Sequence, residues 1–327
     1  MQQRKLWKDG PEVGAIGLGC MSFAGPYGKV DEAQAHRILA AALDHGVTHL
    51  DTAVLYGGGV SENYIGSFIR DNGNRFTIAT KAGIVTKPER RFDNTAAYLR
   101  DSVEASLKRL GLDHIELFYL HRRQQEIPIE EVMGTLVKLK EEGKIGAIGL
   151  SEIAPYTLRR AAAVHPVAAV QNEYSLWTRL PELGLLQACE EMETTFVAFS
   201  PVGRGIFSNR MPVIEELGEN DFRRSNPRFA EPNYSLNKAI VSKFNDYATS
   251  QGMSPATMAN AWVLSRGENI ISIPGTKSPE HLAENAKAGD IVLTEAQLAE
   301  IERLLPVGFA YGDRYSDRQS NGPERYC

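Results

Sequence analysis

Four side chains that can carry or transfer a proton follow short apolar runs in the first part of the chain. Asp51, Lys81 and His121 each end such a run, and Tyr56 follows Asp51 in the next loop. A carboxylate, an amine, a phenol and an imidazole at one face would make a compact proton-transfer site. A single Tyr or Asp in such a place is more often structural, but four matching residue types together favour catalysis.

A parallel sheet would bring the ends of these runs together. Short β-branched or apolar runs alternate with longer segments of helical period, which is typical of βα units. The predicted strands cover residues 15–19, 48–51, 76–81, 115–121, 145–150, 167–171, 195–200 and 270–274. Eight strands with intervening helices predict an α/β fold, a (β/α)8 TIM barrel, whose catalytic groups lie at the carboxyl ends of the strands. A doubly wound open sheet is the alternative.

Capping residues predict where several helices begin and end. Asp31 can cap a helix that ends at Gly46, and Asn94 can cap another that ends at Gly111. A further helix is predicted over residues 129–142, with an apolar stripe that would face the sheet. These helices would form the outer ring of the barrel.

Three segments fall outside the regular alternation of strands and helices. Residues 1–14 predict a hairpin with Asp-Gly at its turn, which would cover the bottom of the barrel. Residues 207–237 and the tail 306–327 show no clear period and are candidate walls of a substrate pocket. No linker or shift in composition marks a second domain, so residues 1–327 are expected to form a single barrel domain.

The composition excludes several classes of partner. The 327 residues carry a net charge of -5, which provides no basic field for nucleic acid. No apolar run reaches membrane-spanning length and no signal peptide is recognisable, so we expect a cytoplasmic protein with no membrane partner. Cys20, Cys189 and Cys327 are far apart and form no CxxC pair, which fits a reducing compartment and predicts no metal site.

Five short motifs resemble those of the aldo-keto reductase family. They are Asp-Thr-Ala-Val-Leu-Tyr-Gly at 51–57, Thr-Lys at 80–81, Tyr-Leu-His-Arg at 119–122, Gln-Asn-Glu-Tyr-Ser at 171–175 and Ile-Pro-Gly-Thr-Lys at 273–277. Their order and spacing hold from residue 17 to residue 285, close to the pyridoxal reductase-like and potassium-channel β-subunit-like branches. The resemblance implies the barrel fold and an NAD(P)H-dependent oxidoreductase that reduces an aldehyde or ketone to an alcohol.

The same resemblance implies a catalytic tetrad of Asp51, Tyr56, Lys81 and His121. Tyr56 would give the proton to the carbonyl oxygen, where negative charge develops. Lys81 would lower the pKa of this phenol, and Asp51 would hold Lys81 in place and charged. His121 would donate a hydrogen bond that polarises and orients the carbonyl.

The cofactor site also comes from the resemblance, because Gly-Leu-Gly-Cys at 17–20 lacks the third glycine of a Rossmann fingerprint. An extended nicotinamide dinucleotide would cross the barrel mouth, with its carboxamide on Ser151 and Gln171, its ring on Phe199 and its pyrophosphate along residues 200–204. The residues assigned to it are Gly19, Cys20, Met21, Asp51, Ser151, Gln171, Phe199, Ser200, Pro201, Val202, Gly203, Arg204, Gly275, Thr276, Lys277, His281, Glu284 and Asn285.

Three residues depart from the family pattern. Phe199 stands where the family usually has Tyr, and Glu152 stands where Asn usually contacts the carboxamide. His281 replaces an Arg that commonly meets the adenosine 2′-phosphate, which leaves Lys277 and Thr276 to bind that group. Because lysine makes only point-charge contacts, we expect NADP(H) to be preferred and NAD(H) to be accepted as well.

Other functions of the same fold are alternatives. A channel β-subunit-like regulatory protein would carry Asn at the position of His121, and the enone-reducing branch would carry Glu there. A lyase would use Lys81 to form a Schiff base. The partner is expected to be a small carbonyl compound, bulky or cyclic, because Phe23, Tyr27, Leu55 and Trp177 would line the pocket, although Phe23 and Trp177 suit core packing equally well.

Overall fold

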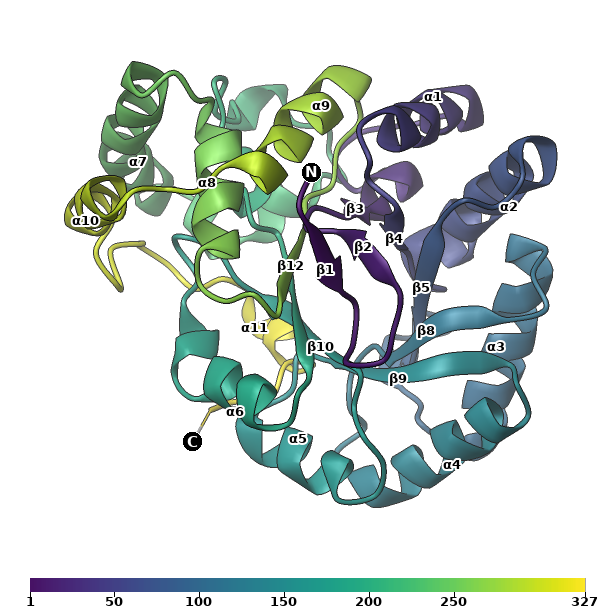
Figure 1. Ribbon diagram of the computed structural model, residues 1–327. Coiled ribbons are helices and arrows are strands. Elements are labelled where there is room, and N and C mark those ends of the chain that lie inside the picture. Colours follow the sequence, from purple (N-terminus) through teal and green to yellow (C-terminus); the bar gives the residue numbers. More distant parts are fainter. Residues whose placement is uncertain (327) are drawn as a thin grey trace.

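Within residues 1–326, which the computed structural model describes, eight parallel strands form a barrel (Figure 1). Neighbouring strands follow the order β3, β4, β5, β8, β9, β10, β11 and β12. Their bounds are Leu18–Gly19, His49–Asp51, Thr77–Ala82, Ile115–Leu120, Ile145–Ser151, Ala169–Glu173, Thr195–Phe199 and Ile270–Ile273. A parallel bridge from Ile16 to Ser272 joins the first and last strands and closes the ring. The predicted barrel is confirmed, with a strand in each predicted region.

Helices surround the barrel on the outside (Figure 1). Their bounds are Glu32–Asp44 (α1), Val60–Asn72 (α2), Ala96–Leu110 (α3), Ile129–Glu141 (α4), Pro155–Ala162 (α5), Leu185–Glu191 (α6), Asn233–Ser250 (α7), Pro255–Leu264 (α8), Pro279–Lys287 (α9) and Glu295–Leu304 (α10). The short helix α11, Asp317–Ser320, belongs to the tail and not to this outer ring. Asp31 caps α1 through its side chain, as predicted. The cap of α3 is Thr95 rather than Asn94, because the side-chain oxygen of Asn94 accepts instead from the Gln124 N–H at 2.5 Å.

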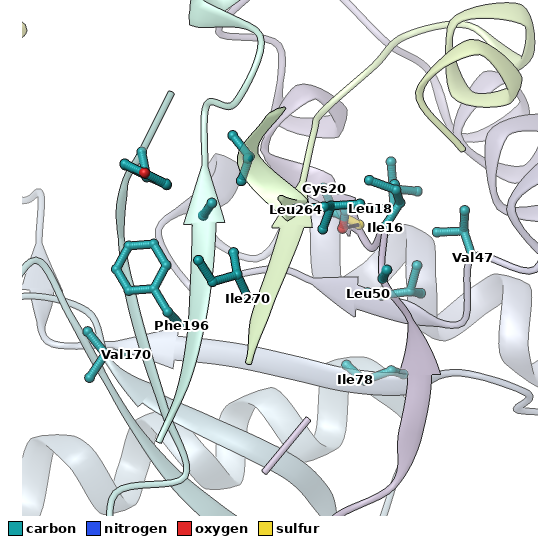
Figure 2. Close-up of a cluster of buried hydrophobic side chains, with 14 of the residues drawn as sticks. Ile16, Leu18, Cys20, Val47, Leu50, Ile78, Val170, Phe196, Leu264 and Ile270 are labelled. Atoms are coloured by element: carbon teal, nitrogen blue, oxygen red, sulfur yellow. Dashed lines mark hydrogen bonds between the residues drawn. The ribbon is translucent and has the colours of Figure 1, made fainter. Parts of the chain in front are cut away.

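Side chains along the barrel strands alternate between the interior and the helix layer, as the two-residue period of a strand requires. Ala79, Leu117 and Val197 belong to the cluster inside the barrel. Ile78 and Phe196, next to them in sequence, belong to the cluster that also contains the apolar side chains of the surrounding helices. Figure 2 shows part of that second cluster. The interior is therefore a packed core, and the carboxyl ends of the strands are left to hold polar groups.

A short hairpin covers the amino-terminal end of the barrel (Figure 1). Its strands are β1, Gln3–Lys5, and β2, Glu12–Gly14, which pair antiparallel. Leu6 and Val13 are fully buried in the cluster inside the barrel. The guanidinium of Arg4 donates to Gly267 O at 2.7 Å. The hairpin thus keeps water from the lower end of the barrel core.

The two long segments are more regular than the sequence suggested. Residues 207–237 contain short 3-10 turns, and their last five residues already belong to α7. A β6–β7 hairpin, Ile84–Val85 with Arg91–Phe92, follows β5 at the barrel mouth. The tail contains α11. No helix in residues 1–326 is long and apolar enough to cross a membrane, and Cys327 lies outside the described residues.

Leu6→Ala should lower the free energy of unfolding by about 2–5 kcal/mol, because it leaves a cavity inside the barrel. Urea unfolding followed by circular dichroism measures the loss. Leu183→Ala is the matched control, since Leu183 is 67% exposed and should change stability by about 0.5 kcal/mol or less. Equal losses in the two variants would contradict the role of the hairpin as a plug.

Candidate active site

Three neighbouring parallel strands carry residues of the expected tetrad to one end of the barrel. Asp51 ends β4, Lys81 lies near the end of β5, and His121 follows β8 directly. Tyr56 begins a short 3-10 turn, Tyr56–Gly58, after β4. Because β4, β5 and β8 are adjacent in the sheet, the four side chains converge at the barrel mouth.

Lys81 and Asp51 form a buried ion pair beneath this mouth, with side chains 0% and 2% exposed. Lys81 Nζ also donates to Thr52 O at 2.8 Å, and Gln171 Nε2 donates to the second Asp51 oxygen at 2.7 Å. Burial lowers the pKa of Lys81, whereas the Asp51 carboxylate opposes that change. Both oxygens of Asp51 are therefore occupied, which fixes the ammonium group in position.

The rings of Tyr56 and His121 lie next to this ion pair. Lys81 Nζ is 5.3 Å from the centroid of the Tyr56 ring. The Tyr56 and His121 rings meet edge to face, with centroids 6.0 Å apart. His121 Nδ1 is buried and has no hydrogen-bond partner among residues 1–326. The structure thus brings together an ammonium, a phenol and an imidazole.

Burial controls the ionisation of both rings. It raises the pKa of the Tyr56 phenol well above 10, and the negative charge of Asp51 adds to this rise. In the protein alone the pKa of Tyr56 therefore rises rather than falls, because burial outweighs any lowering by neighbouring cations. Burial also lowers the pKa of His121 well below 6.5, helped by the cations Arg122 and Lys81. Near pH 7 both groups are neutral and can act as donors.

The two side chains expected to meet a carboxamide are held by other protein groups. Ser151 ends β9, and its Oγ accepts a hydrogen bond from Arg122 Nη1 at 3.0 Å. This leaves the hydroxyl proton of Ser151 free to be donated. Gln171 lies in β10 and is bonded to Asp51. Both side chains are 2% exposed, so their orientation is fixed before any ligand binds.

The segment after β11 turns sharply over the mouth. Phe199 ends β11 half-buried, and Ser200 and Arg204 both have positive φ, at 54° and 57°. Arg204 Nη2 donates to Glu173 at 2.8 Å, and its Nη1 is buried without a partner among the described residues. Pro201, Val202 and Gly203 lie between these strained positions. Strain of this kind is typical of segments that bind ligands.

The chain at the ends of β3 and β12 is closely packed. A Cβ on Gly19 would lie 2.8 Å from Ile273 O, and one on Gly275 would lie 3.0 Å from Gly19 O. Both glycines are therefore required by backbone packing, whatever else they bind. Cys20 is buried and Met21 is partly exposed. Ser22 Oγ donates to Thr276 O at 2.6 Å and ties the two segments together.

The residues expected at the adenosine end lie in α9 and in the segment just before it. Lys277 is exposed and donates to Tyr27 O. Ser278 caps α9 by accepting from the His281 N–H at 3.1 Å. Glu284 accepts from Asn209 at 3.3 Å, and Asn285 accepts from Asn260 at 3.2 Å. These contacts place Lys277 and His281 at the open N-terminus of a helix.

A buried network of charges crosses the mouth, and it was not expected from the sequence. Arg314, in the tail, donates to both Glu152 oxygens and lies 3.5 Å from Glu173. Glu152 has a φ of 55° and accepts from the Glu173 N–H at 2.8 Å. Its carboxylate therefore holds the tail, which explains the departure from Asn at this position. In the sequence, this network was indicated only by Glu152 standing where the family usually has Asn.

A second contact fixes the tail beside the barrel. Glu324 accepts from Arg123 at 2.7 Å, from Thr157 at 2.9 Å and from the Ala154 N–H at 2.8 Å. All these groups are buried. Tyr315 lies between them and the mouth network, with the Arg204 guanidinium 5.3 Å from its ring centroid. The tail therefore forms one wall of the site.

The expected substrate residues fall into two groups. Phe23 and Trp177 are 1% and 4% exposed and belong to the main core cluster. Tyr27 and Leu55 are partly exposed. The Tyr27 ring lies 6.4 Å from that of Phe222, which belongs to the 207–237 segment. Phe222 also meets the ring of Tyr315 at 6.4 Å, so the 207–237 segment contacts both Tyr27 and the tail.

Comparison with known proteins places this arrangement in a family. The sequence model of the Aldo/keto reductase family matches residues 15–306. "Probable aldo-keto reductase 1" of Glycine max is 39% identical over 319 residues, 96% of this chain and 92% of that protein. "Aldo-keto reductase yakc [NADP(+)]" of Schizosaccharomyces pombe is 40% identical over 320 residues, 95% of this chain and 94% of that protein.

Solved structures agree with the sequence comparison. A glycerol dehydrogenase from Gluconobacter oxydans superposes with a TM-score of 0.84 at 28% identity, covering 93% of this chain and 94% of that one. An aldo-keto reductase from Klebsiella pneumoniae, solved in complex with NADPH, has a TM-score of 0.74 at 27% identity, covering 97% and 99%. The chain belongs to the aldo/keto reductase family, and the resemblance inferred from its motifs is confirmed.

Asp51→Asn should destabilise the protein by about 3–5 kcal/mol, because it leaves the Lys81 ammonium buried without a counter-charge. Urea unfolding at neutral pH measures the change. The double variant Asp51→Asn with Lys81→Met removes both charges and should recover most of the loss. If the double variant were no more stable than the single one, an unpaired buried charge could not be the cause.

Proposed function

We propose that this enzyme reduces an aldehyde or ketone to an alcohol with NADPH, and that Asp51, Tyr56, Lys81 and His121 are its catalytic residues. The observation that carries the assignment is the buried Lys81–Asp51 pair beside the Tyr56 and His121 rings. The bound dinucleotide supplies the hydride. Everything else in the step concerns the carbonyl oxygen, which must gain a proton as it becomes an alcohol.

Tyr56 is the proton donor because its phenol holds its proton at neutral pH and lies at the mouth. Neutral His121 donates a hydrogen bond to the same oxygen and orients it. When Tyr56 gives up its proton, the positive charge of Lys81, 5.3 Å from the ring centroid, stabilises the phenolate that remains. Asp51 keeps Lys81 charged through this step.

The residues around the mouth fit a dinucleotide. Ser151 keeps a free hydroxyl proton for a carboxamide, and the half-buried ring of Phe199 offers a flat apolar surface. The unpartnered Nη1 of Arg204 is a buried donor without an acceptor, which a phosphate oxygen would satisfy. Lys277 at the N-terminus of α9 suits a 2′-phosphate. The name of the Schizosaccharomyces pombe relative and the Klebsiella pneumoniae complex support NADP(H) as the preferred cofactor, with NAD(H) accepted.

The alternative functions fit the site less well. A Schiff-base lyase needs a neutral and accessible lysine, whereas Lys81 is fully buried and bonded to Asp51 and Thr52. A purely regulatory subunit needs no imidazole at the position of His121. The substrate is a small carbonyl compound, and the aromatic rings around the mouth favour a bulky or cyclic one. We also propose that the protein acts in the cytoplasm as a single barrel domain.

Tyr56→Phe should lower kcat by about 10²–10⁴-fold, because only the proton donor is lost. A panel of aldehydes and ketones, followed by loss of reduced-nicotinamide absorbance, measures the rates. Quenching of protein fluorescence by NADPH should remain as in the wild type. Tyr247→Phe, in α7, is the matched control and should keep full activity. Retained turnover in Tyr56→Phe would overturn the tetrad.

Lys277→Met should raise KM for NADPH about tenfold and leave KM for NADH nearly unchanged, because only NADPH carries the 2′-phosphate. Initial rates with both cofactors measure the two constants. Lys287→Met, at the other end of α9, is the control and should change neither. A wild-type enzyme that strongly preferred NADH would refute the assignment of the cofactor.

A further inference from the structure

Arg122, the residue after His121, is an arginine at the mouth without an acidic partner. It is 9% exposed. No carboxylate of residues 1–326 lies within 4.0 Å of its guanidinium, whereas Arg204 pairs with Glu173 and Arg314 with Glu152. A buried cation normally has a counter-ion because losing hydration is costly. Arg122 and Arg228 are therefore both buried arginines without a carboxylate in direct contact, and Arg122 is the one that adjoins His121.

One edge of the Arg122 guanidinium is fixed and the other is free. Nη1 donates to His121 O at 2.6 Å and to Ser151 Oγ at 3.0 Å, which uses both of its hydrogens. Nε and Nη2 donate to no group in residues 1–326, and neither is a fully covered atom. Both therefore face accessible space. Their parallel N–H groups form the fork that binds a carboxylate through two hydrogen bonds.

A second arginine, Arg90, lies within electrostatic range of Arg122. Arg90, in the β6–β7 hairpin, stacks 5.8 Å from the Phe92 ring centroid and donates to Arg318 O at 3.3 Å. A Cβ on Gly322 would touch both Arg122 and Phe92, which shows that the hairpin, the tail and Arg122 meet at one place. Arg90 has no acidic partner within 4.0 Å among the described residues either.

These two cations lie next to the reacting groups. Arg122 is bonded to the backbone of His121, and both Arg122 and Arg90 help to lower the pKa of His121. The other charged or titratable groups near this place are Arg318, the phenol of Tyr315 and the Glu152 carboxylate, which already pairs with Arg314. An anion bound here would be held close to the imidazole that orients the carbonyl.

We propose that the substrate is an aldehyde or ketone that also carries a carboxylate, and that Nε and Nη2 of Arg122 bind this carboxylate with Arg90 as the supporting cation. The inference rests on the proposed function and defines its substrate class. Arg122 then determines specificity and also orients Ser151. The substrate carboxylate supplies the directly bonded counter-charge that Arg122 lacks within residues 1–326.

The test compares each of ortho-, meta- and para-carboxybenzaldehyde with its own methyl ester. For at least one isomer, the wild-type enzyme should show a kcat/KM for the acid about tenfold or more above that for the ester. Arg122→Gln should bring this ratio close to one. Because the ratio compares two substrates in the same variant, a general loss through Ser151 or His121 cancels. Arg91→Gln, on the exposed side of the same hairpin, should leave the ratio unchanged.

A second measurement needs only the wild-type enzyme. Raising NaCl from about 0.05 to 0.5 M should lower kcat/KM for the acid and leave that for the ester unchanged, because salt screens charge attraction. An enzyme that reduces the esters but does not prefer any acid would overturn this inference while the proposed function stands. An enzyme that reduces no aldehyde with NADPH would overturn the proposed function itself. An unchanged ratio in Arg122→Gln would also reject Arg122 as the carboxylate site.

Discussion

The buried Lys81–Asp51 ion pair is the interaction on which the rest of the site depends. Two charges can remain in a dry interior only if their geometry is good and their other bonding positions are filled. Thr52 and Gln171 fill them here, from a loop and from a strand on the far side of the barrel. The closed ring and the β1–β2 hairpin exclude water from the amino-terminal end of the barrel. The fold therefore keeps an ammonium group charged beside the phenol that must lose its proton.

Charge compensation also explains the construction of the mouth. Glu173 ends β10 and Glu152 directly follows the adjacent β9, and each pairs with an arginine from a long segment. Arg314 joins the tail to the barrel and Arg204 joins the loop after β11 to it. Buried ion pairs therefore hold the segments of the mouth in place, whereas apolar packing holds the barrel together. Arg122, which this scheme leaves without a paired carboxylate, adjoins the reacting groups.

Local patterns in the sequence were sufficient for the barrel, the hairpin and the convergence of the four reactive side chains, because each follows from the position of a residue relative to the end of a strand. The cap of α3 was misassigned because the side-chain oxygen of Asn94 is bonded to the Gln124 N–H, a contact between distant segments. The pairing of Arg314 with Glu152 spans 162 residues and leaves no periodic trace. The pKa of Tyr56 was expected to fall, but it depends on burial, which sequence position alone does not reveal.

The closure of the ring has a consequence for how the chain folds. The bridge from Ile16 to Ser272 and the bond from Arg4 to Gly267 join the two ends of the barrel sequence, the latter across 263 residues. Contacts between such distant residues carry a large entropic cost and form late, which slows folding. Until the first and last strands pair, water can reach the barrel interior. Catalytic activity should thus appear in a single late step of folding, when the last strand pairs with the first, rather than gradually as the helices assemble.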